Sequence, residues 1–526
     1  MKKTCLYFLL LLLCASAAVG QPASVNNGDI VVLYENDVHG SIEGYPLMAA
    51  LRDQMRTLTP YVTVVSCGDF LSGTPLGSVS RGRYLIRLMN AVGYDYITLG
   101  NHEFDFGIDT LAQRMSELSA TVLCGNFASV GGTPFFLCHA IRQYGDVKVA
   151  FVGVTTPTAP TSSTPMFFQD STGVWRYTFF PNSLDSLVQQ CVDEVRRQGV
   201  DYVVVLSHLG DIDLPELVAA TTGIDVVLDG HSHSVIPHTL LRNREGKEVL
   251  WTSTGSRFSN IGRLVIPRGG TPVSELLATS AMPPAFNAVS DTLRAIQQAY
   301  DSIARRRVGY SQVRLWRRGH EGNNFDAPLG NFFCDAFLAV MSDSVDMALM
   351  NSGGIRDDVR AGEVLFGDLY SAAPFDNKLC LVEMKGQAIL DALEMGCRLF
   401  PLMGGGFLYV SGLKYEIDTA QPSTVVCDEN GVFVRVEGAR RVKNVMVFNK
   451  VRQKWVPLVP AHTYRVVGCD YILLKQGDGH RFPDVKVIHP SICPYVEALE
   501  KYLRDYLQGV VGKYQFGHPQ GRIIAR

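Results

Sequence analysis

Residues 30–40 read IVVLYENDVHG, and this stretch sets the pattern for the first half of the chain. An apolar, β-branched run of strand length ends just before Asp37 and His39. Further apolar runs of similar length follow at residues 62–65, 96–99, 149–154, 202–206 and 226–228. Because helical stretches separate these runs, the pattern predicts an α/β domain.

Five short polar motifs come directly after such strands. They read Asp37-Val38-His39, Gly68-Asp69, Gly100-Asn101-His102-Glu103, Ser207-His208 and Gly230-His231-Ser232-His233. Loops at strand ends converge on one edge of a sheet, so side chains distant in sequence can meet there. Five polar clusters of this kind are costly to bury without a metal. The motifs therefore predict one metal site at that edge.

The donor atoms of these motifs suit divalent metal ions. The candidate ligands, none of them a cysteine, are Asp37, His39, Asp69, Asn101, His208, His231 and His233. Oxygen and imidazole donors suit Zn²⁺, Mn²⁺, Co²⁺ or Mg²⁺. Two such ions side by side clamp an in-line displacement at phosphorus, so the set predicts a dimetal phosphatase. Each motif alone is weak, since a single DxH or His-x-His is often structural.

Length and composition limit the expected number of domains and the expected classes of binding partner. A chain of 526 residues is too long for one ordinary core, so we expect two domains. Hydrophobic content of 47% and charged content of 19% are typical of a globular protein. A net charge of −3 gives no reason to expect binding to nucleic acid or to anionic membranes. Oligomeric state does not follow from these properties.

The first 20 residues read as a secretory signal peptide. Lys2 and Lys3 precede an apolar core at residues 6–13, and cleavage is expected after Gly20. A transmembrane anchor is the rival interpretation, but the apolar run is too short for it. A lipoprotein at Cys14 is a second rival, which Leu13 disfavours because a small residue normally precedes such a cysteine. We therefore expect export to the periplasm or the cell exterior.

The ten cysteines that follow the signal peptide are scattered and contain no CxxC pair. Some could pair in an oxidising compartment, and their connectivity cannot be deduced from the sequence. Four of them lie in apolar surroundings and are predicted to be small core residues: Cys67, Cys124, Cys334 and Cys380.

A domain boundary is predicted near the middle of the chain. Residues 267–284 are rich in Pro, Gly and Ser, and residues 287–307 then read as one helix with Asn287 as its N-cap. The apolar stripe of this helix is Val289, Leu293, Ile296, Tyr300 and Ile303. We thus expect a metal-binding domain at 28–280, a helical linker at 285–308 and a second domain at 310–526.

With these motifs identified, the chain resembles the secreted bifunctional metallophosphatase/5′-nucleotidases of the calcineurin-like phosphoesterase superfamily. The resemblance rests on residues 36–40, 100–105 and 230–233, and in the second half on 329–331, 351–356, 374–377, 410–412 and 477–479. It implies a four-layer calcineurin-like metallophosphoesterase sandwich, a helical linker and an α+β 5′-nucleotidase C-terminal domain.

The resemblance also implies how the ligands are shared. One ion would be held by Asp37, His39, Asp69 and His233, and the other by Asp69, Asn101, His208 and His231. Asp69 would bridge the two ions. The family often has Gln at the position of His233, and both residue types can ligate. His102 would face the phosphoryl group, oriented by Asp105, and its alternative role is to support the ligands without touching the substrate.

Four residues of the second half would bind the substrate. The resemblance implies that Arg356 reaches the phosphate, Asn351 lies near the base or sugar, Asp478 accepts from ribose hydroxyls and Phe375 stacks on the base. The planar fork of an arginine suits a phosphate. The alternatives are that Asn351 and Asp478 are only turn residues and that Phe375 belongs to the core.

The sequence departs from the family pattern at two places. An arginine is usual shortly before the Gly-Asn motif, but residues 321–328 contain none, and Arg317 and Arg318 lie further back. A second base-stacking aromatic is expected six residues before Asp478, where Ile472 stands. Tyr471 is adjacent, but neighbouring strand residues point to opposite faces, so we expect it to face away from the base.

The resemblance implies hydrolysis of nucleoside 5′-monophosphates to nucleoside and phosphate. Related phosphoesters remain as alternatives: 2′,3′-cyclic nucleotides, UDP-sugars or dinucleotides. A further alternative is a non-catalytic secreted binding protein, against which the intact set of seven ligands argues.

Overall fold

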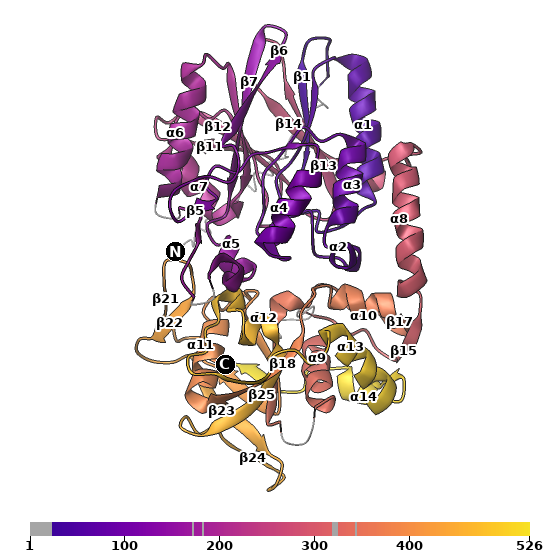
Figure 1. Ribbon diagram of the computed structural model, residues 1–526, viewed down its shortest axis with the longest axis vertical. Coiled ribbons are helices and arrows are strands. Elements are labelled where there is room, and N and C mark those ends of the chain that lie inside the picture. Colours follow the sequence, from indigo (N-terminus) through magenta and orange to yellow (C-terminus); the bar gives the residue numbers. More distant parts are fainter. Residues whose placement is uncertain (1–23, 171–172, 181–182, 318–324, 342–344) are drawn as a thin grey trace, which may run out of the picture.

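The structure is a computed structural model that describes residues 24–170, 173–180, 183–317, 325–341 and 345–526. The expected signal peptide at residues 1–20 therefore lies outside the described residues. The molecule has two parts stacked along its long axis, with helix α8 (Ala288–Ala304) on one flank (Figure 1). In the described part of the chain, every helix is too short or too polar to cross a membrane.

The first part contains two six-stranded sheets. One has the order β14 (Val273–Ala278), β13 (Asn260–Ile266), β1 (Ile30–Glu35), β2 (Val62–Ser66), β3 (Tyr96–Ile97) and β4 (Thr121–Val122). The other has the order β11 (Val235–Arg242), β12 (Glu248–Thr254), β10 (Val226–Leu228), β9 (Tyr202–His208), β7 (Val147–Thr155) and β6 (His139–Tyr144). Strands β1 to β4 are mutually parallel, as are β7, β9, β10 and β12.

Both faces of these sheets are buried, which explains why their strands read as unbroken apolar runs. Along β1, Val31 and Leu33 pack toward helices α1 (Gly44–Leu58), α3 (Arg83–Val92) and α4 (Ile108–Glu117). Val32 and Tyr34 point the other way and pack between the sheets. Helices α6 (Leu184–Arg197) and α7 (Gly210–Ala220) cover the outer face of the second sheet (Figure 1). The four-layer α/β sandwich is thereby confirmed.

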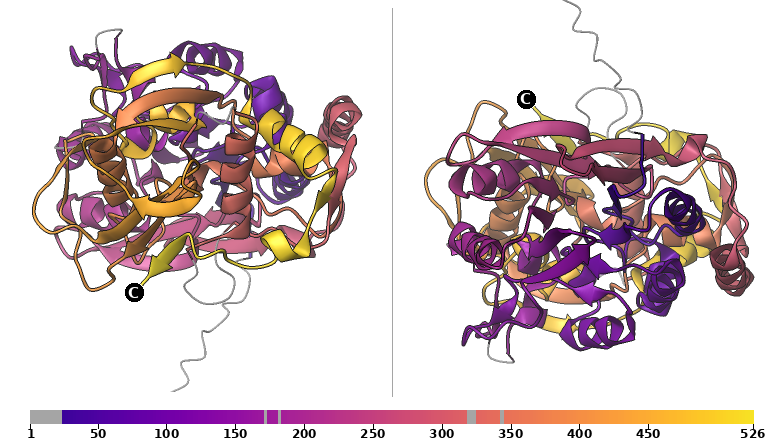
Figure 2. Two further views of the ribbon diagram at one scale, coloured as in Figure 1. Left: turned by 90° about the horizontal axis from the view of Figure 1, so that it is seen from below. Right: turned by 90° about the horizontal axis from the view of Figure 1, so that it is seen from above.

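The join between the two parts differs in one respect from the sequence prediction. Strand β14 lies inside the Pro/Gly/Ser-rich stretch, where it pairs with β13 at the edge of the first sheet. Helix α8 begins after Asn287, whose side chain accepts the N–H of Ser290 in a capping box. Val289 and Ile296 of α8 are buried against the first part, and the helix lies at the periphery in both end-on views (Figure 2).

The second part is an α+β unit around one hydrophobic core. Its central sheet has the order β19 (Leu408–Ser411), β16 (Met347–Asn351), β25 (Thr463–Cys469), β18 (Leu379–Lys385) and β26 (Lys486–His489). Helices α9 (Pro328–Ala339), α11 (Gly386–Gly396) and α13 (Tyr495–Lys501) pack on it. A smaller sheet is formed by β24 (Lys454–Pro457), β23 (Val442–Asn449), β20 (Leu413–Ile417) and β28 (Ile523–Ala525).

The remaining strands lie outside the larger sheets of the two parts. A three-stranded sheet has the order β17 (Gly362–Leu365), β15 (Arg307–Ser311) and β27 (Val510–Val511). A hairpin is formed by β21 (Val425–Cys427) and β22 (Phe433–Val436), and in the first part β5 (Ala128–Ser129) pairs with β8 (Tyr177–Thr178).

Short elements meet where the two parts face each other. The first part contributes α2 (Pro75–Ser80), η1 (His102–Phe104), α5 (Ala159–Ser162) and η2 (Pro165–Phe168), and the second contributes α10 (Phe366–Ala372), α12 (Asp470–Leu473) and η6 (Gly477–Gly479) (Figure 1). Ser78 donates its hydroxyl to the Pro374 carbonyl across this junction. An ion pair between Arg81 and Asp376 at 3.7 Å crosses it as well.

The ten cysteines of the described residues divide into one disulfide and a set of free thiols. Cys138 and Cys191 are bonded to each other, which ties the start of β6 to α6. Cys67, Cys124, Cys334 and Cys380 are free and buried, so the prediction that they are core residues is confirmed.

Candidate functional site

The seven candidate ligands all follow strands at one edge of the two facing sheets. Asp37 follows β1, Asp69 follows β2, Asn101 follows β3, and His208 ends β9. His231 and His233 follow β10. Because these strands run parallel within each sheet, their carboxyl ends bring the ligands together.

Five of these ligands have left-handed backbone conformations. Their φ angles are 53° for Asp37, 47° for His39, 60° for Asp69, 78° for His231 and 59° for His233. An L-residue in this region costs on the order of 1 kcal/mol or more, and such strain persists only where the surrounding structure determines it.

Hydrogen bonds between the ligand loops hold these conformations. The Asp37 N–H donates to the Gly68 carbonyl at 3.0 Å, and the His39 N–H donates to the Asp69 carbonyl at 2.8 Å. The His231 N–H donates to Asp37 Oδ2 at 2.8 Å, which links the two sheets. The loops therefore fix one another, and the ligand directions are set by the fold.

The donor atoms converge in two overlapping groups. Asp37, His39 and His233 form one group, and Asp37, Asp69 and His208 form another, with the donor atoms of each group within 4.8 Å of one another. His208 Nε2 lies 3.2 Å from Asp69 Oδ2, and His233 Nε2 lies 3.3 Å from Asp37 Oδ1. Oxygens and imidazole nitrogens at this spacing suit divalent cations.

Four buried atoms of the predicted ligand set test whether metal ions fit here. They have no hydrogen-bond partner among the described residues, and they are Asp37 Oδ1, His39 Nδ1, Asn101 Oδ1 and His208 Nε2. Buried polar atoms are nearly always paired, because an unpaired one costs roughly 1–3 kcal/mol. Divalent ions at this site would supply the missing partners. The His208 Nδ1–H donates to the Cys67 carbonyl at 2.7 Å, which leaves Nε2 as the free donor atom.

His231 and His102 do not belong to the two groups of donor atoms. His231 is in neither group, although its ring centroid lies 5.2 Å from that of His208. His102 forms a third group with His39 and Asp69, so distance alone does not exclude it as a ligand. Its role as a non-ligand stays a prediction.

His102 is held by Asp105. The ring Nδ1 lies 2.8 Å from Asp105 Oδ2, and Asp105 also accepts from the hydroxyls of Ser72 and Ser163. Burial lowers the pKa of His102, but the Asp105 and Asp69 carboxylates more than offset this, so its pKa lies above the ordinary value. The pairing through Nδ1 leaves Nε2 available to a substrate.

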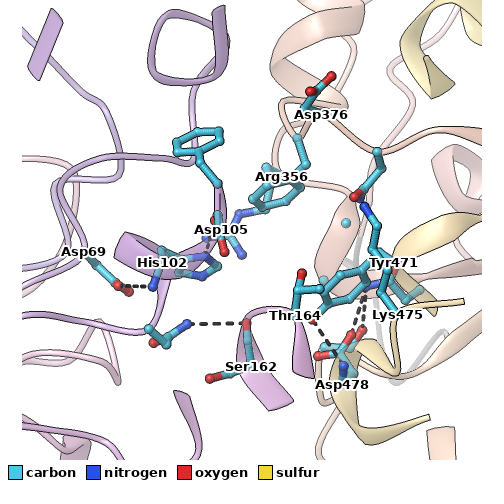
Figure 3. Close-up of a pocket in the computed structure, with 18 of the residues that line it drawn as sticks. Asp69, His102, Asp105, Ser162, Thr164, Arg356, Asp376, Tyr471, Lys475 and Asp478 are labelled. Atoms are coloured by element: carbon cyan, nitrogen blue, oxygen red, sulfur yellow. Dashed lines mark hydrogen bonds and ion pairs between the residues drawn. The ribbon is translucent and has the colours of Figure 1, made fainter. Parts of the chain in front are cut away.

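A cavity of about 430 Å³ lies between the two parts and contains these residues. This volume is within the usual range for small-molecule sites. In Figure 3, His102 and Asp105 lie on one side of it, and Tyr471, Lys475 and Asp478 lie on the other. All four predicted substrate residues line the cavity: Asn351, Arg356, Phe375 and Asp478.

Arg356 brings a buried cation toward the catalytic side of the cavity. Burial lowers its pKa to about 10, with contributions from the nearby Arg317 and Arg257 guanidinium groups. A group with that pKa still carries its proton at neutral pH. Three guanidinium groups near one another favour an anionic ligand.

Asn351 and Asp478 form one polar unit. Asn351 Nδ2 donates to Asp478 Oδ2 at 2.9 Å. Gly405 packs so closely on this carboxylate that an added Cβ would lie 2.8 Å from Asp478 Oδ1. Burial raises the pKa of Asp478 to about 6, despite the opposing effect of Arg398 and Asn351.

Phe375 and Tyr471 are two aromatic residues that line the cavity, and Tyr471 is placed differently from the sequence prediction. The Phe375 ring is near the Arg356 guanidinium, whose carbon lies 5.7 Å from the ring centroid, so it is close to the phosphate-binding side. Tyr471 lines the cavity, whereas Ile472 is buried in the core and only 1% exposed. The expectation that Tyr471 faces away is therefore wrong, because residues 470–473 form a helical turn and not a strand.

Several residues in or beside the cavity were not assigned a role from the sequence. Arg317 reaches the Ile355 carbonyl at 3.3 Å, so it lies beside Arg356 despite its distance from the Gly-Asn motif. Arg257 belongs to the first part of the molecule. Its guanidinium group donates to the Arg356 carbonyl of the second part at 3.3 Å. Lys475 lines the cavity and pairs with Asp470 at 2.8 Å. Only the proximity of Lys475 to Gly477-Asp478 offered a sequence signal.

Comparisons with known proteins identify both parts. The calcineurin-like phosphoesterase family matches residues 30–235, and the 5′-nucleotidase C-terminal domain matches residues 307–486. A 5′-nucleotidase of Bos taurus is 25% identical over 93% of this chain and 91% of its own. A trifunctional nucleotide phosphoesterase of Bacillus subtilis is 24% identical over 74% of this chain and 29% of its own.

A solved structure shows the same arrangement over nearly the whole length. The 5′-nucleotidase precursor from Thermus thermophilus is 26% identical, with a TM-score of 0.80. The similarity covers 94% of this chain and 99% of that one.

Proposed function

This chain belongs to the 5′-nucleotidase family of metallophosphoesterases, and on that premise we propose that it hydrolyses nucleoside 5′-monophosphates to nucleoside and inorganic phosphate. One observation carries the proposal. A single cavity is lined both by candidate metal ligands such as Asp69 and His231 and by the substrate residues Arg356 and Asp478. The reacting phosphate and the nucleoside can therefore be bound at once.

Two divalent ions are assigned to the ligand set. One would be held by Asp37, His39, Asp69 and His233, and the other would be held by Asp69, Asn101, His208 and His231. When bound, such ions polarise a phosphoryl oxygen and lower the pKa of water to near neutrality. Arg356 binds the remaining phosphate oxygens through its guanidinium group, which stays charged in the cavity.

His102 acts on the leaving group. Asp105 fixes its ring through Nδ1, so Nε2 is directed toward the substrate. As an imidazolium it stabilises the charge that develops on the phosphoryl group and donates a proton to the ribose 5′-oxygen. Asp105 supports this role because its carboxylate raises the pKa of His102 against the opposing effect of burial.

The nucleoside is bound by residues of the second part. Asp478 accepts hydrogen bonds from ribose hydroxyls, and Asn351 holds Asp478 in place through Nδ2. Phe375 and Tyr471 offer aromatic faces in the same cavity for the base. The preferred base does not follow from these residues, because stacking is tolerant of base identity.

Related phosphoesters form a second candidate function. A relative is named a trifunctional nucleotide phosphoesterase, and the cavity holds Arg81 and Lys475 in addition to Arg356. These cations suit substrates with a further anionic group, such as dinucleotides or UDP-sugars.

A hydrolysis panel tests the proposal, with the products separated by chromatography because diesters and pyrophosphates release no inorganic phosphate in their first cleavage. The full chain is assayed with Mn²⁺, Co²⁺ or Zn²⁺ against AMP, other nucleoside monophosphates, a 2′,3′-cyclic nucleotide, a UDP-sugar, a dinucleotide and 4-nitrophenyl phosphate. We expect the highest kcat/KM for a nucleoside 5′-monophosphate. A preference for any other ester would overturn the substrate assignment, and inactivity on every ester despite bound metal would favour a binding protein.

A further inference from the structure

Two buried carboxylates outside the ligand set contact the loops that carry the ligands. Glu103 is 0% exposed and Asp229 is 1% exposed. Neither is assigned a part in binding metal or substrate above. Each follows a strand of a different sheet, Glu103 after β3 and Asp229 after β10.

Glu103 joins the loops after β2 and β3. Its Oε2 accepts the N–H groups of Asp69 and of Gly100, each at 2.7 Å. Its Oε1 accepts the N–H groups of Phe70 at 2.8 Å and Leu71 at 3.0 Å. Both oxygens are thereby used to fix the peptide of the bridging ligand Asp69 and the peptide next to Asn101.

Asp229 plays the corresponding part in the second sheet. Its Oδ1 accepts the Leu209 N–H at 3.1 Å and the Gly210 N–H at 3.4 Å, directly after the ligand His208. Asp229 itself lies two residues before the ligand His231. The loops are closely packed here, since a Cβ added to Gly230 would lie 2.9 Å from His208 Nδ1.

The loops held by these two carboxylates carry the four ligands of one ion. Asp69 and Asn101 lie on the loops bound by Glu103, and His208 and His231 lie beside Asp229. The other ion depends on His233, whose side chain is 41% exposed. The other ligands are less open to water: His231 is half-buried, and at most 3% is exposed of Asp37, His39, Asp69, Asn101 and His208. His233 is therefore the ligand that makes its ion the more accessible to water.

We propose that Glu103 and Asp229 are positioning residues that make the ion at Asn101 and His208 the tightly held one, while the ion at His233 exchanges readily. The proposal rests on the dimetal function proposed above. Loops that are already held in place lose little conformational freedom when the ion binds. Residues that orient ligands therefore contribute to metal affinity. Replacing Glu103 with Gln puts an N–H₂ donor against a peptide N–H and loosens the loop, because both of its oxygens accept. At Asp229 only Oδ1 accepts and Oδ2 has no partner among the described residues, so the informative change there is Asp229→Ala.

The first experiment identifies the tight site by its ligands. The full chain is stripped of metal and titrated with Co²⁺ under equilibrium dialysis, with the visible spectrum recorded at each step. We expect two ions of unequal affinity in the wild type, loss of the tight class in Asn101→Ala and loss of the weak class in His233→Ala. Loss of the tight class in His233→Ala overturns the proposal.

The second experiment tests the two carboxylates. Glu103→Gln and Asp229→Ala should raise the dissociation constant of the tight Co²⁺ by about 10–100-fold and alter its visible spectrum, with a smaller change in the weak class, which shares the ligand Asp69. Glu394→Gln is the matched control, because Glu394 is also 0% exposed and accepts the Val442 N–H at 2.8 Å, but it lies in the second part. It should leave both classes unchanged.

The outcomes separate the inference from the function on which it rests. A wild type that binds a single ion overturns the dimetal function and the inference together. Two ions of equal affinity, or unchanged affinities in both Glu103→Gln and Asp229→Ala, overturn the inference alone. Melting curves of metal-free protein control for folding. If one carboxylate variant does not fold, the other variant and the Asn101→Ala and His233→Ala pair still decide the result.

Discussion

The ring of Phe375 lies parallel to the ring of His102, with centroids 6.1 Å apart and an interplanar angle of 17°. Phe375 belongs to the second part of the molecule and His102 to the first. The side chain that the sequence assigns to the base is therefore also next to the proposed proton donor. The two parts share one catalytic cavity, and substitutions on either side should affect nucleotide hydrolysis.

Phe375→Ala should raise KM for AMP by about tenfold or more, with a smaller change in kcat. Stacking on a base is worth roughly 1–3 kcal/mol and is felt equally in ground and transition states. Steady-state kinetics on AMP and on 4-nitrophenyl phosphate measure this, with Phe375→Tyr as the ring-preserving control. An equal loss of kcat on both substrates, with KM for AMP unchanged, would mean that the ring supports His102 and does not bind the base.

Tyr471→Ala should also raise KM for AMP, because Tyr471 lines the cavity and offers a second aromatic face. Tyr471→Phe keeps the ring and removes only the hydroxyl that accepts the Asp478 N–H at 3.2 Å, so its effect should be smaller. Ile472→Phe should not lower KM. Since Ile472 is buried, the larger side chain should instead destabilise the fold by about 1–3 kcal/mol, which thermal unfolding measures. An improved KM in Ile472→Phe would contradict this placement.

Removal of metal should abolish phosphate release, and added Mn²⁺, Co²⁺ or Zn²⁺ should restore it. Asp69→Asn should be more damaging than His39→Ala, because the Asp69 carboxylate is assigned to both ions and His39 to one. Elemental analysis together with phosphate release measures this. Full activity in excess chelator, without retained metal, would exclude the dimetal chemistry.

His102→Ala should retain both metal ions and lower kcat for AMP by roughly 10²–10⁴-fold, the usual effect of losing a proton-transfer group. The loss should be smaller for 4-nitrophenyl phosphate, whose leaving group is stable without protonation. Asp105→Asn should show the same pattern more weakly, since Asp105 acts through the ring of His102. A parallel fall in metal content and activity would instead identify His102 as a ligand, as its position near His39 and Asp69 permits.

The KM for AMP should rise as the pH falls through about 6. Burial raises the pKa of Asp478 to about 6, so below that pH the carboxyl group carries a proton and accepts ribose hydroxyls poorly. The measurement is the ratio of kcat/KM for AMP to kcat/KM for 4-nitrophenyl phosphate, plotted against pH. Both substrates need the same metal ions, so acid-induced loss of metal cancels in this ratio. The ratio should lose its inflection in Asp478→Asn, and an inflection that persists in that variant belongs to another group.

The sequence predicted the central parallel strands of the sandwich because these strands are largely buried on both faces. Six apolar runs correspond to β1, β2, β3, β7, β9 and β10, with ends that differ by at most two residues. The other six strands of the two sheets were not recognised. One of them is β14, whose Pro- and Gly-rich surroundings outweigh the signal of a short edge strand. Tyr471 was misplaced because a four-residue helical turn has no periodic signal that separates it from a strand end.

The sequence by itself determined the kind of chemistry, because the donor type of each side chain is a local property. Seven oxygen and nitrogen ligands after apolar strands are recognisable without coordinates. Only the tertiary structure decided what surrounds them: the four peptide N–H groups on Glu103, the position of Arg317 beside Arg356, and the contact of Phe375 with His102. These relationships join residues up to hundreds of positions apart. The first two depend on how loops pack within one part, and the third depends on how the two parts pack together. No local pattern of residues encodes either kind of packing.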